Sequence, residues 1–213
     1  MMHKIIPLFV SLLFICQLAS AQFSFGARVG VSTSDISGKD LNILSENGTE
    51  NLRLALADAK YGIHAGLIFQ FKGSRWSIQP EVHFNSNKVD FEVEDINDPM
   101  ASTIIKEESY QYLDIPILLG LHLGPLHFQG GPVGHVFLSS TTELNDLEGY
   151  EQDFESLTVG YQVGGGLDIW NITLDVRYEG NFTGFGEHIQ FFDRQYELDD
   201  SPSRWLFSLG FYF

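Results

Sequence analysis

Apolar side chains occupy every second position in several stretches of the chain, with small or polar residues between them. This period of two predicts β-strands whose two faces meet different surroundings. The first such stretch begins at Phe23 and the last one ends at Phe213. The predicted strands cover residues 23–32, 61–72, 76–85, 113–123, 126–138, 159–169, 172–178 and 205–213. The pattern therefore predicts an all-β protein with eight strands.

Short turns and long polar segments alternate between these strands. Tight turns are expected at Gly-Ser 73–74, Gly-Pro 124–125 and Trp-Asn 170–171. The polar segments cover about residues 33–60, 94–108, 139–158 and 183–203. Bacterial outer-membrane barrels have this plan, with turns in the periplasm and loops outside the cell. We therefore expect an eight-stranded antiparallel up-and-down transmembrane β-barrel in the bacterial outer membrane, with four long extracellular loops.

A soluble β-sandwich is the alternative that alternation alone leaves open. The constant contrast between the two faces argues against it, because one face stays apolar while the other holds charge and glycine. Aromatic residues at the strand ends, such as Trp76 and Trp205, resemble the girdles at the two membrane interfaces. The outward-facing Leu209, Phe211 and Phe213 of the last strand resemble the signal that the outer-membrane insertion machinery reads.

Residues 1–21 have the features of a secretory signal peptide. Lys4 precedes an apolar run over 5–18, and Ala-Ser-Ala at 19–21 fits a cleavage site. The run is shorter than the roughly 20 apolar residues that a spanning helix needs. We expect cleavage after Ala21 and a barrel domain over 22–213. Cys16 would leave with the signal, and Ile15 stands where a lipoprotein motif needs a small residue.

The charge balance narrows the possible partners. The chain has 12 Lys and Arg against 28 Asp and Glu, a net charge of −16, which makes nucleic acid a poor partner. After Ala21 no apolar run is long enough for a spanning helix, so membrane insertion requires a closed barrel. The acidic segment over 139–158 could gather Ca²⁺ but lacks the spacing of an EF-hand loop. We expect no cofactor.

Residues 112–119, Tyr-Leu-Asp-Ile-Pro-Ile-Leu-Leu, resemble a signature of the PorT-like outer-membrane barrels of Bacteroidetes. Residues 130–134, 174–178 and 208–213 are similar to other strands of that family. The resemblance implies a barrel domain but no particular role. The namesake of the family is linked to a dedicated protein-secretion system, and no feature of the sequence assigns the chain to it.

Histidine pairs are the main candidates for chemistry on the inward face. Ungapped two-residue turns would pair His122 with His127 and Asp114 with His135, and would set His64 opposite another histidine, His83. Two histidines could bind a metal, and an acid with a histidine could form part of a general-base dyad. The sequence supplies neither a third ligand at the same height nor a serine beside the dyad.

A structural role explains the same residues better. A barrel of eight strands is just wide enough for side chains to fill it, and buried charges must be paired. Gly164, expected opposite Arg177, would make room for that side chain. We predict a polar interior network of Arg28, His64, Glu81, His83, Asp114, His122, His127, His135, Asp168, Asp175, Arg177 and Glu179, with no catalytic, cofactor or metal residues.

The resulting functional expectation is a non-enzymatic barrel that is structural or presents acidic loops for binding. Two alternatives stay open: a small lipid-modifying enzyme, either hydrolase or acyltransferase, built on Asp114 and His135, and a subunit of a protein-secretion or assembly complex. The expected partners are outer-membrane lipid, the insertion machinery during assembly, and an extracellular or secretion-complex protein.

Overall fold

The computed structural model describes residues 22–35, 40–44, 50–96, 103–147, 149–152, 156–182, 189–196 and 203–213. The predicted signal peptide over 1–21, with Cys16, lies outside these residues. Among the described residues, no helix combines the length and hydropathy needed to cross a membrane.

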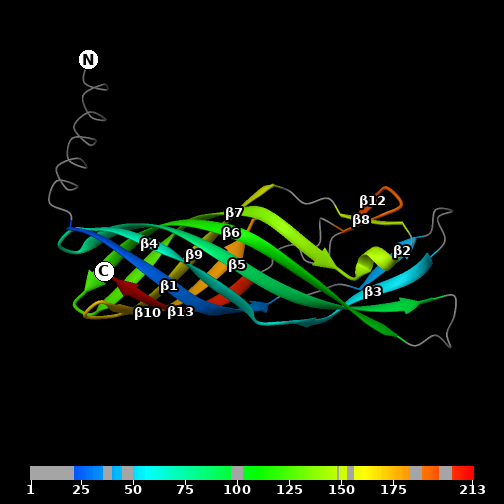
Figure 1. Ribbon diagram of the computed structural model, residues 1–213, viewed down its shortest axis with the longest axis horizontal. Helices are drawn as coiled ribbons and strands as arrows, with labels where there is room; N and C mark the ends of the chain where they lie inside the picture. Colours follow the sequence, from blue (N-terminus) through cyan, green and yellow to red (C-terminus); the bar gives the residue numbers. More distant parts are fainter. Residues whose placement is uncertain are drawn as a thin grey trace, which may run out of the picture.

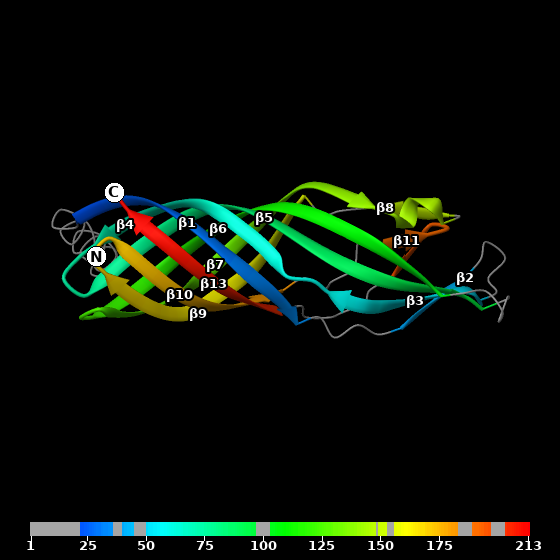
Figure 2. The same ribbon diagram turned by 60° about the horizontal axis from the view of Figure 1, so that its bottom comes forward.

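Antiparallel strands close into a ring, and each strand is tilted relative to the long axis of the molecule (Figures 1 and 2). The ring runs in the order β5-β4-β1-β13-β10-β9-β7-β6 and closes by pairing β5 with β6. Its strands are β1 (Gln22–Asp35), β4 (Gly62–Lys72), β5 (Trp76–Asp95), β6 (Ile104–Leu123), β7 (Leu126–Thr142), β9 (Leu157–Ile169), β10 (Ile172–Asn181) and β13 (Ser203–Tyr212). The all-β barrel predicted from alternation is therefore confirmed.

The strand count differs from the sequence prediction. The described part of the main sheet has ten strands, because β2 (Leu41–Leu44) and β3 (Glu50–Ala59) continue it from β5. A second sheet contains β8 (Tyr150–Gln152), β11 (Ile189–Phe191) and β12 (Arg194–Tyr196), and a short 3-10 helix, η2, covers Leu144–Asp146. The segments that we predicted as plain loops therefore contain strands, and eight is too low a number for the whole fold.

The inward face of β5 changes character along its length. Near the turns, Gln79, Glu81 and His83 are buried, whereas near the loops Val89 and Phe91 are buried on the same face. The intervening outward positions become charged, for example at Lys88 and Glu92. This reversal explains why the strand predicted over 76–85 ended too early. The strand continues beyond residue 85, but there its apolar side chains face inward instead of outward.

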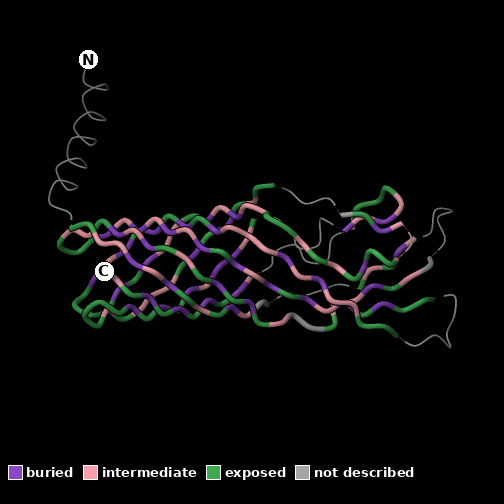
Figure 3. Tube along the Cα trace, viewed as in Figure 1, coloured by how far each residue is buried: buried purple, intermediate pink, exposed green. Residues whose placement is uncertain are grey.

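An apolar core fills the loop end of the molecule. Three of the four segments predicted as loops contribute to it, together with residues of β5 and β6 that lie outside the predicted strands and loops. The buried members are Ile43, Leu54, Val89, Phe91, Val93, Tyr110, Leu144, Tyr150, Ile189 and Phe191. Figure 3 shows buried positions continuing into this end of the molecule. We call this part the head: β2, β3, residues 86–95 of β5 and 104–111 of β6, η2, β8, β11 and β12.

The outer surface of the ring is apolar. Ile115, Ile117 and Leu119 are 38%, 50% and 59% exposed and pack against no second sheet within the described residues, which argues against the sandwich. Every strand of the ring exposes large apolar side chains in this way, a far larger area than soluble monomers leave open. Exposed Trp76 near the turns and Trp205 near the loops stand at the two edges of this belt.

Two of the three predicted turns have the expected register. Leu123 pairs with Leu126, and Ile169 with Ile172. The turn after β4 is longer than predicted: Lys72 pairs with Ser77, and the backbone N–H of Gly73 donates to the carbonyl oxygen of Trp76 at 2.7 Å.

This longer turn corrects one predicted pair. His64 lies opposite Asn85 instead of His83, because the turn holds residues 73–76 and shifts the register by two. The imidazoles of His64 and His83 nevertheless stack with their centroids 5.7 Å apart, since inward side chains of neighbouring strands also meet diagonally.

Candidate functional site

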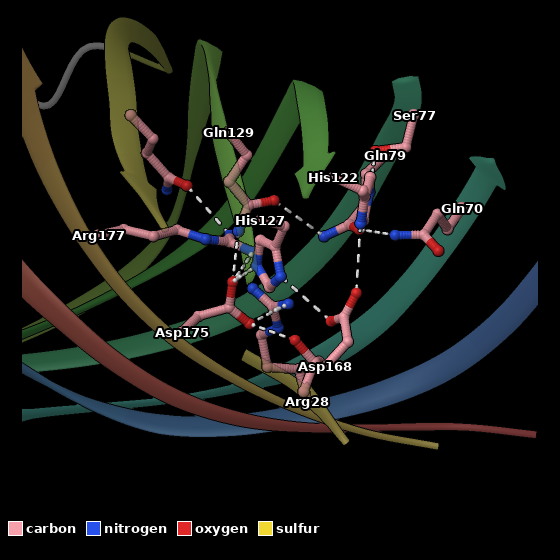
Figure 4. A network of polar contacts seen from close by, with 12 residues as sticks. Arg28, Gln70, Ser77, Gln79, His122, His127, Gln129, Asp168, Asp175 and Arg177 are labelled. Atoms are coloured by element: carbon pink, nitrogen blue, oxygen red, sulfur yellow. Dashed lines mark hydrogen bonds and ion pairs between the residues drawn. The ribbon is translucent and has the colours of Figure 1, made fainter. Parts of the chain in front are cut away.

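The interior of the ring holds a network of bonded charges, part of which Figure 4 shows. Glu81 accepts hydrogen bonds from both terminal nitrogens of Arg177 at 2.8 Å. Arg28 lies between two carboxylates, 3.2 Å from Glu81 and 2.8 Å from Asp175. All four side chains are buried, so each charge is balanced inside the barrel.

A second group of charges lies closer to the head. Arg204 binds Asp114 through Nη2 at 2.7 Å and Glu179 through Nε at 2.6 Å. Asp114 also faces Nδ1 of His135 at 2.7 Å and accepts a hydrogen bond from Asn85 at 2.7 Å. Asp114 therefore has three polar partners, and the sequence prediction identified only the histidine.

A third group lies near the short turns. The carboxylate of Asp168 lies 3.3 Å from Nδ1 of His122 and 3.1 Å from Nδ1 of His127 (Figure 4). His127 uses Nε2 to contact Asp175 at 3.0 Å. The Lys72 ammonium is 3.4 Å from Asp168. This group joins β4, β6, β7, β9 and β10.

All twelve residues predicted for the interior network lie inside the ring. Asp168 is partly exposed at the turn end, and the other eleven are buried. The prediction missed Arg204 and the buried glutamines Gln70, Gln79, Gln129 and Gln162. Arg204 could have been found, because it immediately precedes the outward-facing Trp205 and alternation turns it inward.

Gly164 makes room for Arg177, as expected. The two residues pair across β9 and β10, and a Cβ atom on Gly164 would lie 2.7 Å from the Cα atom of Arg177. Glycine at this position lets the long arginine side chain cross the interior at the height of Glu81.

Two of the histidines lie in arrangements that bear on nucleophilic catalysis. His135 lies against Asp114, but its other nitrogen, Nε2, faces Glu179 at 3.9 Å and no serine. Ser77, His122 and Asp168 do stand in the order of a hydrolase triad, with Ser77 Oγ 2.9 Å from Nε2 of the imidazole. Ser77 is only 4% exposed, however, so its hydroxyl is closed off from a substrate.

The residues predicted as an insertion signal lie on the outer surface of the last strand. Leu209, Phe211 and Phe213 are all exposed. The backbone N–H of Phe213 donates to the carbonyl oxygen of Phe25 at 2.8 Å, and the two rings stack with centroids 5.7 Å apart. These contacts place Phe213 at the seam between the first and last strands.

The head carries a surface charge cluster outside the belt. Glu107 accepts hydrogen bonds from Lys88 at 2.6 Å and from Lys60 at 2.9 Å. These bonds hold the pKa of Glu107 below its ordinary value. The same cluster raises the pKa of Lys60, mainly through hydrogen bonds to Asp90 and Glu107.

Comparison with known families matches residues 17–185 to the outer membrane protein beta-barrel domain. A comparison with curated proteins finds no match.

Solved structures with a similar arrangement include Neisserial surface protein A (NspA), with 12% identity and a TM-score of 0.48, covering 91% of this chain and 99% of that chain. The outer membrane protease OmpT from Escherichia coli has 8% identity, coverage of 91% and 96%, and a TM-score of 0.42. LpxR from Salmonella typhimurium has 9% identity, coverage of 88% and 100%, and a TM-score of 0.32.

Proposed function

The chain belongs to the family of outer membrane protein beta-barrel domains and resides in the bacterial outer membrane, and from this premise we propose that it is a non-enzymatic binding protein. Its ring anchors the molecule in lipid, and its head presents a folded surface to a ligand or protein outside the cell. The interior network serves as a structural plug.

The eight strands of the closed ring cross the membrane, and β2 and β3 belong to the head alone. The apolar belt supports this division, since it covers the ring strands near the turns and is replaced by outward charges such as Lys88 and Glu92 in the head. The termini and short turns then face the periplasm, as in other barrels of this type.

The observation that carries the proposal is the common core of the head. Side chains from four separate segments, for example Ile43, Phe91, Leu144 and Phe191, pack into one buried cluster. A surface ordered in advance loses less conformational entropy when it binds than mobile loops do. The acidic balance of the chain favours a cationic or basic partner.

The experiment uses a photo-crosslinking residue placed in intact cells at Asp146, an exposed head position, or at Trp170, an exposed turn position. We expect a discrete adduct from Asp146 and none from Trp170. Purified wild-type protein in planar bilayers should give no steady conductance, because the interior is filled. Equal adducts from both positions, or an open channel, would contradict the proposal.

A lipid-acting enzyme is the competing function, and it rests on the 2.7 Å contact between Asp114 and His135. Purified protein incubated with lipopolysaccharide and phospholipid should leave the acyl chains unchanged by mass spectrometry. Release or transfer of an acyl chain that is lost in His135→Ala and retained in His64→Ala would replace the binding role with an enzymatic one.

We also propose that the chain is PorT-like, on the strength of residues 112–119. In this segment Asp114 turns inward to Arg204, and Ile115 and Ile117 face lipid. Membership of a secretion complex predicts a stoichiometric partner after purification in mild detergent. A monomer without such a partner would favour an independent barrel.

A further inference from the structure

We propose that the turn end of the barrel is a binding site for a divalent transition metal, Zn²⁺ by ligand type, formed by His122, His127 and Asp168. The three residues come from β6, β7 and β9, which pair in that order. One ligand atom from each residue lies within 4.8 Å of the other two. Two imidazoles and one carboxylate are a donor set typical of zinc with an open fourth position.

The distances fit ligands around one ion. Zinc bonds to imidazole nitrogen and carboxylate oxygen measure about 2.0–2.1 Å, so two tetrahedral ligand atoms stand about 3.3 Å apart. The Asp168 oxygens lie 3.3 Å from Nδ1 of His122 and 3.1 Å from Nδ1 of His127. Each imidazole nitrogen therefore stands at ligand spacing from one carboxylate oxygen, Oδ2 for His122 and Oδ1 for His127.

The two Nδ1 atoms are also without a hydrogen bond, although both are buried. The polar group near both of them is the Asp168 carboxylate, at 3.3 and 3.1 Å. A buried polar atom without a hydrogen bond is costly, and a metal ion between the three groups would satisfy both nitrogens at once.

The Nε2 atoms of both imidazoles have polar partners, as the second ring nitrogen of a metal-binding histidine usually does. Nε2 of His127 contacts Asp175 at 3.0 Å, and Nε2 of His122 contacts Ser77 Oγ at 2.9 Å. Such outer contacts place the ring proton on Nε2 and leave the Nδ1 lone pair for the ion. Asp168 is partly exposed at the turn end, which gives the ion a path from the periplasm.

The charged side chains around the site decide what competes with a cation there. Arg28, Arg177 and Lys72 face the carboxylates of Glu81, Asp168 and Asp175, which gives three charges of each sign when the histidines are neutral. Lys72, 3.4 Å from Asp168, competes with the ion, but it is partly exposed and can turn to solvent.

A second three-residue cluster lacks these properties. Asp114, His135 and Glu179 also lie within 4.8 Å of one another. The Arg204 guanidinium already bridges the two carboxylates, at 2.7 and 2.6 Å, and only one imidazole is present. A cation is therefore already in place there, and the turn-end cluster is the better metal site.

The test uses the full chain folded in detergent, stripped with a chelator and dialysed against Zn²⁺, with metal content measured by mass spectrometry and affinity by calorimetry. We expect one Zn²⁺ per chain. His122→Ala, His127→Ala and Asp168→Asn should each weaken binding by about 100-fold or more, and Ser77→Ala by about tenfold. His64→Ala, which removes an interior histidine of a different group, should bind as wild type does.

Two further measurements separate loss of binding from loss of folding. Gel mobility of unheated samples reports a folded barrel in each variant, and Co²⁺ in place of Zn²⁺ gives the visible absorption of a tetrahedral site. Lys72→Gln removes the competing cation and should raise the affinity. A stripped wild type that takes up no Zn²⁺ would overturn the proposal. Uptake unchanged in folded His122→Ala and Asp168→Asn would overturn it as well.

Discussion

Glu81 and Arg177 join opposite walls of the barrel. Their side chains form a two-pronged ion pair at 2.8 Å, although 96 residues separate them in the sequence. Glu81 lies on β5 and Arg177 on β10, and three strands stand between them on either side of the ring. This ion pair therefore links two strands on opposite sides of the ring directly across the interior.

Glu81→Gln tests the contribution of this pair to stability. The amide keeps the shape of the side chain but leaves Arg28 and Arg177 to share one carboxylate, that of Asp175, at 2.8 and 3.6 Å. Because an uncompensated buried charge is left behind, we expect the free energy of unfolding to fall by about 3–5 kcal/mol. The measurement is reversible denaturant unfolding in detergent micelles.

Glu94→Gln is the matched control. Its carboxylate is 49% exposed in the head and lies 3.5 Å from Arg53. Solvent screens such a pair, so the same substitution should cost less than about 1 kcal/mol. Equal losses in the two variants would show that the interior pair is no stronger than a surface pair.

Gly164→Ala tests the space that the glycine leaves for Arg177. The added Cβ would meet the backbone of β10, 2.7 Å from the Cα atom of Arg177, and the strands must separate to admit it. We expect a loss of about 1–3 kcal/mol in the free energy of unfolding. In Gly134→Ala the nearest atom, Cδ1 of Leu157, is 3.7 Å away, and stability should be almost unchanged.

Ile117→Arg tests the position of the apolar belt. Ile117 is exposed on β6 within the belt, and a charge there should cost about 2–4 kcal/mol in lipid. Ile105→Arg places the same charge on the same strand but in the head, where Ile105 is also exposed. We expect little effect at this second position, measured by refolding into lipid vesicles. A similar cost at both positions would place the membrane boundary beyond the head.

Glu107 should make the head sensitive to acid. Hydrogen bonds from Lys88 and Lys60 lower its pKa from the ordinary 4.5. The stabilisation is complete above that value and is lost as the pH falls through the lower, folded-state pKa. Since the cluster is on the surface, the effect should be small and weakened by salt. Thermal unfolding of wild type and Glu107→Gln should differ at neutral pH and converge in strong acid.

Alternation predicted the ring because its two faces differ at almost every position. The same signal stopped at residue 85 of β5, where the buried face passes from polar residues such as His83 to apolar ones such as Phe91. Strand periodicity persists through this reversal, but a search for one constant apolar face does not detect it. Residues 86–93 were therefore assigned to no strand, although Val89, Phe91 and Val93 already carried the pattern in the sequence.

Within the interior, local registers were predictable and contacts across the ring were not. The pair of His122 with His127 follows from one two-residue turn. The approach of Asp168 to both of them depends on the pairing of β7 with β9, which a long segment separates in the chain. Turn length also mattered: two additional residues in the turn after β4 were enough to place His64 opposite Asn85 in the register, although its ring still stacks on that of His83.

The shared core of the head links its formation to the completion of the barrel. Its parts reach one another only when β2 and β3 attach to β5 while η2, β8 and β11 arrive from strands elsewhere in the ring. A chain inserted with one strand out of place would lack a finished head. A partner that recognises the head would therefore bind only correctly assembled molecules, because only these present the complete docking surface.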